Sequence, residues 1–482
     1  MMRLNRSIIH HLTVVIARRF SQRGHNLNRL SQLSWPPFLL SLRVYSHSSA
    51  SSLPHSLPTL RFRLEMENVV EKPWSDRTTD SADVKELFSG VRSDSPIPSS
   101  IVNRAHFLCA QYLGGAWKTS SIDRFSIKQI TGGMSNLLFL VELCHSLSLK
   151  HSEPRRALLR IHCQSDIDQL LTESVVFTLL SERKLGPRLL GVFPGGRFEQ
   201  YIPSRPLECT EISEHRLITK ISPMLARVHS LDVPIGKEPQ LINRMQTWIN
   251  KWSSYESSRN GIDMKCTRAR VHPSKVTHLI IFFLSSLPLQ YPSHLSIKDL
   301  KSEVEFIERF LDAVHSPIIF SHNDLQEGNI LLIEKEEDGD SEDLALIDFE
   351  YCDYNYRGFD LGNHMCEYGL DYACEEHPCY FVYPDKLDME EERRRFCTGY
   401  MEELYEMQSK GIHVPSELLS GDKEKDLERL EMEASLFMPI SHLFWSTWAL
   451  LNAEQSSITF GYAEYGRDRI AMYFDGKTKM EE

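Results

Sequence analysis

Three polar residues in the second half of the chain have the types and the spacing that transfer of a phosphoryl group requires. Asp324 precedes Asn329 by five positions, and Asp348 follows Asn329 by 19 positions. A carboxylate can accept the proton of an attacking hydroxyl group, and carboxylate and amide oxygens can hold the Mg²⁺ ions that neutralise nucleotide phosphates. We therefore predict that Asp324 is the catalytic base and that Asn329 and Asp348 are magnesium ligands.

Short apolar segments beside these residues predict the elements that hold them in place. Ile330–Ile333 follows Asn329 directly, residues 344–347 precede Asp348, and both have the pattern of short buried strands. The acidic run at residues 334–343 is most simply a solvated loop between them. A lone His-x-Asp would usually be a turn, but the complete order of carboxylate, amide, strand and second carboxylate is specific for phosphoryl transfer.

The region before the catalytic residues has the alternation of a small antiparallel sheet. Phe125–Ile130 and residues 137–141 alternate on either side of a Gly-rich break, which predicts a hairpin. Further elements are predicted in the same way: a helix over residues 101–117 that ends at Gly114-Gly115, a strand at residues 157–161, a helix at residues 165–184, and two short strands around a turn at residues 194–197.

Beyond Glu208 the pattern is mostly helical, with amphipathic stretches at residues 212–231, 303–314 and 390–408. A small sheet followed by a larger helical region predicts an α+β fold of two lobes. The expected divisions are a leader at residues 1–65, a linker with a loose helix at 66–99, an N-lobe at 100–207 that binds the nucleotide, and a C-lobe at 208–482 that carries the catalytic loop and the acceptor site.

Composition excludes several classes of protein. The chain has 482 residues, of which 41% are hydrophobic and 25% charged, as in ordinary globular proteins. Its net charge of −12 argues against nucleic acid as a partner. The ten cysteines are scattered without a Cys-x-x-Cys pair, and the longest apolar run in the body, residues 279–284, is too short to span a bilayer. We expect a reduced, cytoplasmic protein with no transmembrane segment.

The first 64 residues differ from the rest because they contain nine Arg and no Asp or Glu. An Arg-rich and Ser-rich segment without acidic residues is typical of a mitochondrial transit peptide. An equally open alternative is that Met66, where acidic residues begin, is the true or an alternative start.

Two segments resemble the signatures of choline/ethanolamine kinases, which share a protein-kinase-like fold with aminoglycoside phosphotransferases. Residues 322–332, HNDLQEGNILL, resemble the catalytic loop of that family, and residues 348–351 with 355–360 and 362–364 resemble its second signature. The resemblance extends over residues 84–474. It implies transfer of the γ-phosphoryl of ATP to choline with Mg²⁺ as cofactor, the first step of phosphatidylcholine synthesis. It also implies some activity on ethanolamine and a homodimer, or a heterodimer with a related kinase.

The resemblance also implies a nucleotide site. Arg160 would contact the phosphates and be oriented by Glu173, and Gln326 would contact the nucleotide. The Gly-rich tip of the hairpin, alone an ordinary turn, would lie over the phosphates, and the segment that begins within the fifth predicted strand would be the hinge that meets adenine. These last two groups are Gly132, Gly133, Met134, Ser135 and Asn136, and Gln200, Tyr201, Ile202, Pro203, Ser204 and Arg205.

A quaternary ammonium cannot donate a hydrogen bond, so its recognition needs aromatic faces and a nearby carboxylate. Trp445 and Trp448 are three positions apart and would project from one face of a helix. Two tryptophans at this spacing are by themselves more often core, but the family resemblance favours a choline site. It implies a substrate site made of Asp324, Tyr351, Glu367, Tyr372, Trp445, Trp448 and Tyr465.

Two features depart from the family pattern. His162 stands where members commonly have an aromatic residue, and residues 266–286 do not resemble the family.

The alternatives that we weigh are an ethanolamine kinase, a small-molecule kinase of the aminoglycoside phosphotransferase type, and a non-catalytic ligand-binding module. The last predicts loss of Asp324, Asn329 or Asp348, and all three are present.

Overall fold

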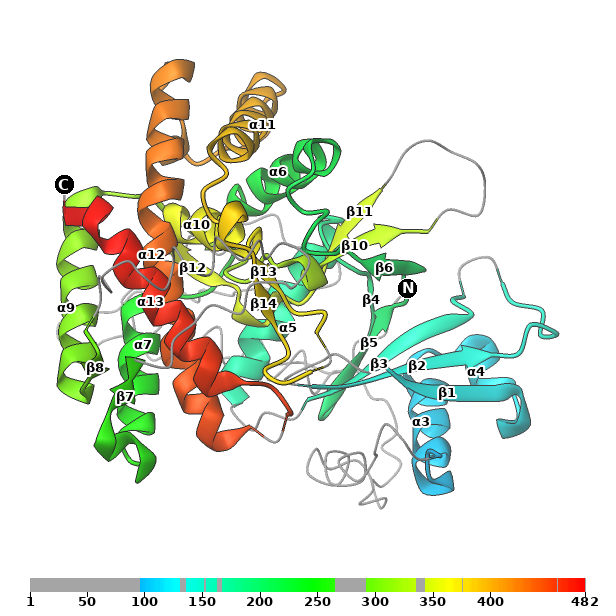
Figure 1. Ribbon diagram of the computed structural model, residues 1–482. Coiled ribbons are helices and arrows are strands. Elements are labelled where there is room, and N and C mark those ends of the chain that lie inside the picture. The colour runs from blue at the N-terminus through cyan, green and yellow to red at the C-terminus, as the bar shows by residue number, and fades with distance from the viewer. Residues whose placement is uncertain are drawn as a thin grey trace, which may run out of the picture.

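The computed structural model describes residues 96–130, 136–150, 153–162, 167–264, 292–334, 343–374, 376–456 and 458–481. It consists of a small antiparallel sheet and a larger, mostly helical part, which confirms the α+β expectation (Figure 1). The leader, most of the linker, residues 131–135 of the hairpin tip and the atypical segment 266–286 lie outside the described residues. In the described part, no helix has the length and apolar character to cross a membrane.

The N-terminal sheet has five strands in the order β1-β2-β3-β5-β4. Strand β1 pairs with β2 from Phe125 opposite Leu143 to Ile130 opposite Leu138, which confirms the predicted hairpin. Alternate residues of β2 and β3 point to one face and are fully buried, so the sheet packs against the helices that cover this face. The elements of this part are α3 (Ser99–Tyr112), α4 (Gly115–Thr119), β1 (Phe125–Ile130), β2 (Asn136–Leu143), β3 (Arg156–His162), α5 (Ile167–Glu182), β4 (Leu189–Phe193) and β5 (Gly196–Gln200).

The single helix expected over residues 101–117 is divided into α3 and α4. Gly114 has φ of 69°, a left-handed conformation that glycine adopts without steric cost and that a helix cannot continue through. The chain therefore turns at Gly114, and α4 begins again at Gly115. Trp117 on α4 is fully buried, and its indole Nε1 donates a hydrogen bond to the carbonyl of Pro154 at 2.9 Å.

The strand that follows the N-terminal sheet belongs to a different sheet. Strand β6 (Ser204–Pro206) pairs with β10 (Ile330–Ile333), and β10 pairs with β11 (Leu344–Leu346), all antiparallel. The strands predicted on either side of the acidic loop are thus confirmed, because they are β10 and β11. Between β5 and β6 only residues 201–203 connect the two sheets.

Among the described residues, seven long helices form most of the C-terminal part. The longest, α12, packs against α13, α10, α7 and α11 (Figure 1). The three predicted amphipathic helices are present as α6, α9 and α11, and α9 starts earlier than expected because Ser296 and Asp299 form a capping box at its beginning. The helices are α6 (His215–His229), α7 (Leu241–Trp252), α9 (Ile297–Val314), α10 (Arg357–Glu367), α11 (Glu390–Ser409), α12 (Lys423–Gln455) and α13 (Tyr462–Glu481).

A buried ion pair ties α10 to α12. Arg357 begins α10, and its Nη2 and Nε lie 2.7 and 2.8 Å from the carboxylate oxygens of Glu433 on α12. Both side chains are only 1% exposed. The remaining two-stranded ladders are β9 (Ile318–Ser321) with β12 (Asp353–Tyr356), β7 (Ile262–Asp263) with β8 (His294–Leu295), and β13 (Leu370–Asp371) with β14 (Phe381–Val382).

Candidate active site

The catalytic loop runs from the end of β9 to the start of β10. Asn329 Nδ2 donates hydrogen bonds to the backbone oxygen of Asp324 at 2.8 Å and to its carboxylate Oδ2 at 3.0 Å. The two predicted residues are therefore in direct contact. Since the amide nitrogen of Asn329 is used in this way, its Oδ1 is the atom left to bind a cation.

A buried carboxylate on α10 holds the loop from behind. Asp360 accepts hydrogen bonds from the backbone N–H groups of His322 and Asn323 at 2.6 and 2.8 Å. The imidazole of His229 lies 3.0 Å from Asp360 Oδ2 and 2.8 Å from the hydroxyl of Tyr400. Burial would raise the pKa of Asp360, but hydrogen bonds and charges around it, His229 first, keep that pKa below its usual value. An ionised Asp360 thus fixes two consecutive peptide groups beside the catalytic base.

Asp348 follows β11 in a left-handed conformation, with φ of 58°. The backbone N–H of Ile347 donates to the carbonyl of Asn329 at 3.0 Å, which sets Asp348 beside the other predicted magnesium ligand. Its carboxylate Oδ1 lies 3.9 Å from Nη1 of Arg160 on β3. The structure therefore brings Asp324, Asn329, Asp348 and Arg160 together from both sheets.

We expected Glu173 to orient Arg160, but the structure gives Arg160 a different carboxylate. Its Nε donates to Glu199 Oε1 on β5 at 2.8 Å, while Glu173 on α5 accepts from Arg197 at 2.7 Å. Arg197 lies directly opposite Arg160 in the sheet, and Glu199, two residues along the same strand, shares the face of Arg197 and binds both arginines. Burial alone would lower the pKa of Arg160, but Glu199 and then Asp348 raise it, so the guanidinium stays charged.

The other residues that were predicted to bind the nucleotide make different kinds of contact, and some lie outside the described residues. Gln326 turns back on the loop, where its Oε1 accepts from the N–H of Gly328 at 2.8 Å. Tyr201 stacks under the guanidinium of Arg156 at 4.7 Å, and Gln200 accepts from Arg188 Nε at 3.2 Å. The tip residues Gly132, Gly133, Met134 and Ser135 lie outside the described residues, and Asn136 is described only as the first residue of β2.

The rest of the predicted hinge is bound to its surroundings. Ser204 Oγ donates to the carbonyl of Ile202 at 2.8 Å, and the carbonyl of Pro203 accepts from the N–H of Glu334 at 2.8 Å. Arg205 forms a two-point ion pair with Glu211, at 2.6 and 2.7 Å. Its guanidinium is therefore already satisfied by the protein.

Six of the residues predicted to bind the acceptor form two groups that are joined through the rings of Tyr462 and Phe460, and we call these six residues the acceptor cluster. Its rings are close, with centroids 5.2 Å apart for Tyr351 and Trp445 and 5.5 Å apart for Trp445 and Trp448. The hydroxyl of Tyr372 donates to Glu367 Oε2 at 2.8 Å and lies 3.0 Å from the hydroxyl of Tyr465. The acceptor cluster consists of Tyr351, Glu367, Tyr372, Trp445, Trp448 and Tyr465.

Trp448 is hydrogen-bonded to Tyr351 within the acceptor cluster, whereas Trp445 is tied to α10. Trp445 Nε1 donates to Asn363 Oδ1 at 2.6 Å, and Trp445 is only 5% exposed. Trp448 is half-buried and extends the row of rings to Tyr462 at 5.5 Å. Trp448 is thus the tryptophan better placed to present a face to a ligand.

Electrostatic coupling links the acceptor cluster to the catalytic loop. Burial raises the pKa of Asp324 well above its usual value, and the negative charges of Glu367, Asp348 and Glu350 raise it further. Burial also raises the pKa of Glu367, against the effect of Arg469. The charges of the acceptor cluster and of a predicted magnesium ligand therefore both act on the base.

Several residues around this site were not identified from the sequence. His229, Asp360 and Arg469 come from three different helices, and only Asp360 lies within a quoted motif. Glu327 is 7% exposed and its Oε2 has no hydrogen-bond partner in the described structure. A charged residue at a buried position of an amphipathic helix is the only local signal that could have indicated His229 or Arg469.

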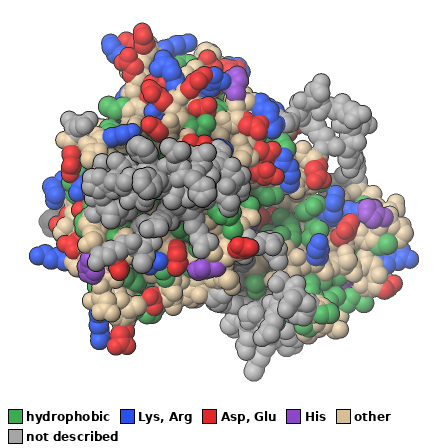
Figure 2. All heavy atoms as spheres, in the orientation of Figure 1, with side chains coloured by type: hydrophobic (Ala, Val, Ile, Leu, Met, Phe, Trp, Pro, Cys, Tyr) green, Lys and Arg blue, Asp and Glu red, His purple; other side chains and the backbone are tan. Residues whose placement is uncertain are grey.

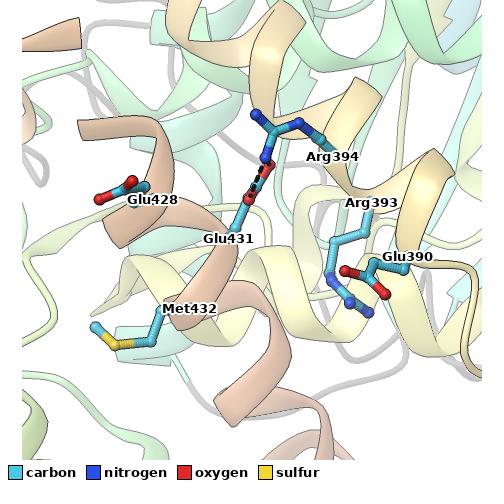
Figure 3. Close-up of a pocket in the computed structure, with 6 residues that line it drawn as sticks. All are labelled: Glu390, Arg393, Arg394, Glu428, Glu431 and Met432. Atoms are coloured by element: carbon cyan, nitrogen blue, oxygen red, sulfur yellow. Dashed lines mark hydrogen bonds and ion pairs between the residues drawn. The ribbon is translucent and has the colours of Figure 1, made fainter. Parts of the chain in front are cut away.

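A surface groove lies apart from these residues, between the beginnings of α11 and α12. Its walls carry the side chains drawn in Figure 3, where Arg394 pairs with Glu431 at 3.0 Å. Figure 2 shows acidic and basic side chains intermixed over this end of the molecule. None of the lining residues belongs to the catalytic loop or to the acceptor cluster, so this groove is separate from the candidate active site. The lining residues are Glu390, Arg393, Arg394, Glu428, Glu431 and Met432.

Residues 127–474, which contain both groups of site residues, match the family model of choline/ethanolamine kinases. The chain belongs to the choline/ethanolamine kinase family. It is 38% identical to choline kinase A2 of Caenorhabditis elegans over 425 residues, which cover 83% of this chain and 91% of that protein. It is 37% identical to a choline/ethanolamine kinase of Homo sapiens over 393 residues, 81% of this chain and 89% of the relative.

Solved structures of this family have the same fold. A choline kinase from Cryptosporidium parvum superposes with a TM-score of 0.57 at 24% identity, covering 79% of this chain and 96% of that one. An ethanolamine kinase from Plasmodium vivax superposes with a TM-score of 0.56 at 19% identity, covering 84% of this chain and 96% of the other. The two-lobed kinase fold expected from the resemblance is confirmed, and the chain is an ATP-dependent phosphotransferase of this family.

Proposed function

We propose that the protein transfers the γ-phosphoryl group of ATP to the hydroxyl group of choline, which gives phosphocholine and ADP. The observation that supports this most is the place of Asp324. Its carboxylate Oδ2 accepts a hydrogen bond at 3.0 Å from Asn329, a predicted magnesium ligand, and the charges of Glu367 in the acceptor cluster and of Asp348 both act on it. A base in this position can reach a hydroxyl group whose ammonium end lies in the acceptor cluster.

On the nucleotide side, Arg160 supplies a fixed positive charge for the phosphates. Glu199 sets its orientation, and the 3.9 Å separation from Asp348 keeps it close to the transferred group. Asn329 Oδ1 and the carboxylate of Asp348 would hold Mg²⁺, which neutralises charge on the β- and γ-phosphates when it is bound. Both are oxygen donors of the kind that Mg²⁺ prefers, so the residues present fit the ion.

On the acceptor side, Asp324 orients the hydroxyl group and accepts its proton as the bond to phosphorus forms. The pKa of Asp324 is raised toward neutral pH by burial. A general base is most effective when its pKa is close to the pH at which the enzyme works. The contact from Asn329 Nδ2 fixes which way the carboxylate faces. Direct in-line transfer follows from this arrangement, and no covalent enzyme intermediate is required.

Ethanolamine is the second candidate acceptor. The hydroxyl of Tyr372 lies 2.8 Å from Glu367 Oε2 and 3.0 Å from the hydroxyl of Tyr465, and these oxygens can accept hydrogen bonds from a primary ammonium. The aromatic rings favour choline, because its methylated cation has no N–H to donate and relies on aromatic faces. An aminoglycoside is disfavoured because several ammonium groups would need a more acidic site than this cluster provides.

The test is ATP-dependent phosphorylation by the purified full chain, with choline, ethanolamine and kanamycin compared in one coupled assay for ADP. Preferential turnover of choline that stops when Mg²⁺ is chelated supports the proposal. Turnover of ethanolamine alone would keep the roles of Asp324, Asn329 and Asp348 but overturn the assignment of the aromatic cluster. The oligomeric state, a homodimer or a heterodimer with a related kinase, is a separate prediction that light scattering can measure on the same sample.

A further inference from the structure

A buried arginine lies directly against the acceptor cluster. Arg469 on α13 is fully buried, with its side chain 0% exposed. Its Nη1 lies 3.3 Å from Glu367 Oε1, and its Nη2 donates to Ser441 Oγ at 3.2 Å. The guanidinium carbon is 5.4 Å from the ring centroid of Tyr465. Helix α13 thus places a cation in contact with both the carboxylate and an aromatic ring of the cluster.

The two oxygens of Glu367 have different partners. Oε1 faces Arg469, whereas Oε2 accepts the hydrogen bond from the Tyr372 hydroxyl at 2.8 Å. This arrangement fixes the orientation of the carboxylate and leaves the Tyr372 side toward the rings. A carboxylate buried to this degree becomes neutral unless a cation or hydrogen bonds stabilise its charged form.

We propose that Arg469 is a positioning residue that keeps Glu367 ionised and correctly oriented, and thereby gives the acceptor site the negative charge that binds the substrate ammonium. This inference rests on the proposed function. Arg469 itself touches neither the base nor the predicted magnesium ligands. It would act on choline only through Glu367.

The surroundings of Glu367 explain why one arginine can have this effect. Burial opposes its charged form, which Arg469 and the hydrogen bond from Tyr372 favour, so that loss of Arg469 leaves one hydrogen bond against burial and shifts the carboxyl toward its protonated form. The charged and titratable groups that face Glu367 are Asp324 and Glu327 from the catalytic loop, Cys209, Cys366, Tyr372, Tyr465 and Arg469.

The experiment compares the wild type with Arg469→Met, which removes the charge at similar size, and with Arg469→Lys, which keeps it. Choline is the right probe because its cation has no proton to lose, so a pH dependence of its KM comes from the protein. We expect the KM of the wild type and of Arg469→Lys to change by less than about threefold between pH 6 and 9. For Arg469→Met, KM should rise by up to about tenfold for each pH unit below the new pKa of Glu367, with kcat nearly unchanged.

Choline binding without ATP, followed by tryptophan fluorescence, should show the same pH dependence as KM. A KM for Arg469→Met that stays as independent of pH as in the wild type would overturn the inference. So would equal losses of kcat and kcat/KM at every pH, because these indicate a structural role only. A wild type that neither binds nor phosphorylates choline would instead overturn the proposed function, and the inference with it.

A second variant covers the case in which Arg469→Met does not fold. Arg469→Met combined with Glu367→Gln removes both members of the ion pair and leaves no buried charge uncompensated. We expect this double variant to fold, with a raised KM for choline that equals that of Glu367→Gln alone and does not vary with pH. Choline affinity close to that of the wild type in the double variant would contradict the proposed role.

Discussion

Trp448 gives the sharpest test of the acceptor cluster, because its role can be measured as a difference between two substrates. Its ring lies 5.5 Å from that of Trp445 and 5.5 Å from that of Tyr462, both nearly edge-on. Each aromatic pair contributes roughly 0.5–1.5 kcal/mol to packing. Replacement by alanine removes this packing whichever acceptor is present, so the common loss cancels in a comparison of choline with ethanolamine.

The part that does not cancel is the cation–π contact. A desolvated contact between a quaternary ammonium and a tryptophan face is worth about 1–2 kcal/mol. We therefore expect Trp448→Ala to raise the KM for choline by a factor about 5–30 larger than the KM for ethanolamine. Ethanolamine loses less because its N–H groups still find Glu367 and the hydroxyl of Tyr372, which lie 2.8 Å apart.

The assay measures initial rates at saturating ATP for both acceptors, with Trp448→Phe as the matched control. Phenylalanine keeps an aromatic face, so most of the affinity for choline should be retained. Thermal unfolding of each variant reports whether the packing with Trp445 and Tyr462 has changed the fold. Equal factors for choline and ethanolamine would refute the reasoning and would leave Trp448 as a core residue only.

Three further predictions concern the machinery around this cluster. Asp324→Asn should lower kcat by about 10²–10⁴-fold, because the base is lost, while ADP binding measured by calorimetry persists; a variant with nearly normal kcat would disprove the assignment. Glu433→Gln should lower the free energy of unfolding by about 3–5 kcal/mol in urea titrations, because it leaves the buried guanidinium of Arg357 without its counter-charge, whereas an unchanged midpoint would show that the ion pair contributes little. Glu199→Gln should raise the KM for ATP more than Glu173→Gln does, because Glu199 is the carboxylate that binds Arg160, and the reverse order would favour the pairing expected from the sequence.

The parts of the site that are local in the sequence could be predicted. Asp324 and Asn329 are five positions apart and an apolar strand follows them, so their types and spacing were enough to assign both to one catalytic loop, where the structure shows them in contact. The hairpin of β1 and β2 was predictable because its alternation has the period of a strand on both sides of the break. Both predictions depend on residues within a few positions of one another.

Contacts between distant segments were harder to predict. The sequence pointed to Glu173 as the partner of Arg160, and only the register of β3 and β5 shows that Glu199 binds it. Asp360 fixes the catalytic loop from 37 positions away, measured to Asn323. Neither its burial nor its two N–H donors can be seen in the sequence, because both depend on how α10 packs beneath the loop.

The connection between the two sheets has a mechanical consequence. Strand β5 ends at Gln200, and the carbonyl of Pro203 is already hydrogen-bonded to the N–H of Glu334 after β10. A rotation of the five-stranded sheet against the catalytic loop would therefore have to be taken up by the short connection at Tyr201 and Ile202. Arg160 belongs to the five-stranded sheet and Asp348 to the loop after β11. A rotation of the sheet would therefore change the 3.9 Å distance between Arg160 Nη1 and Asp348 Oδ1. A distance measurement between spectroscopic labels on β3 and β11 would detect such a rotation when the nucleotide binds.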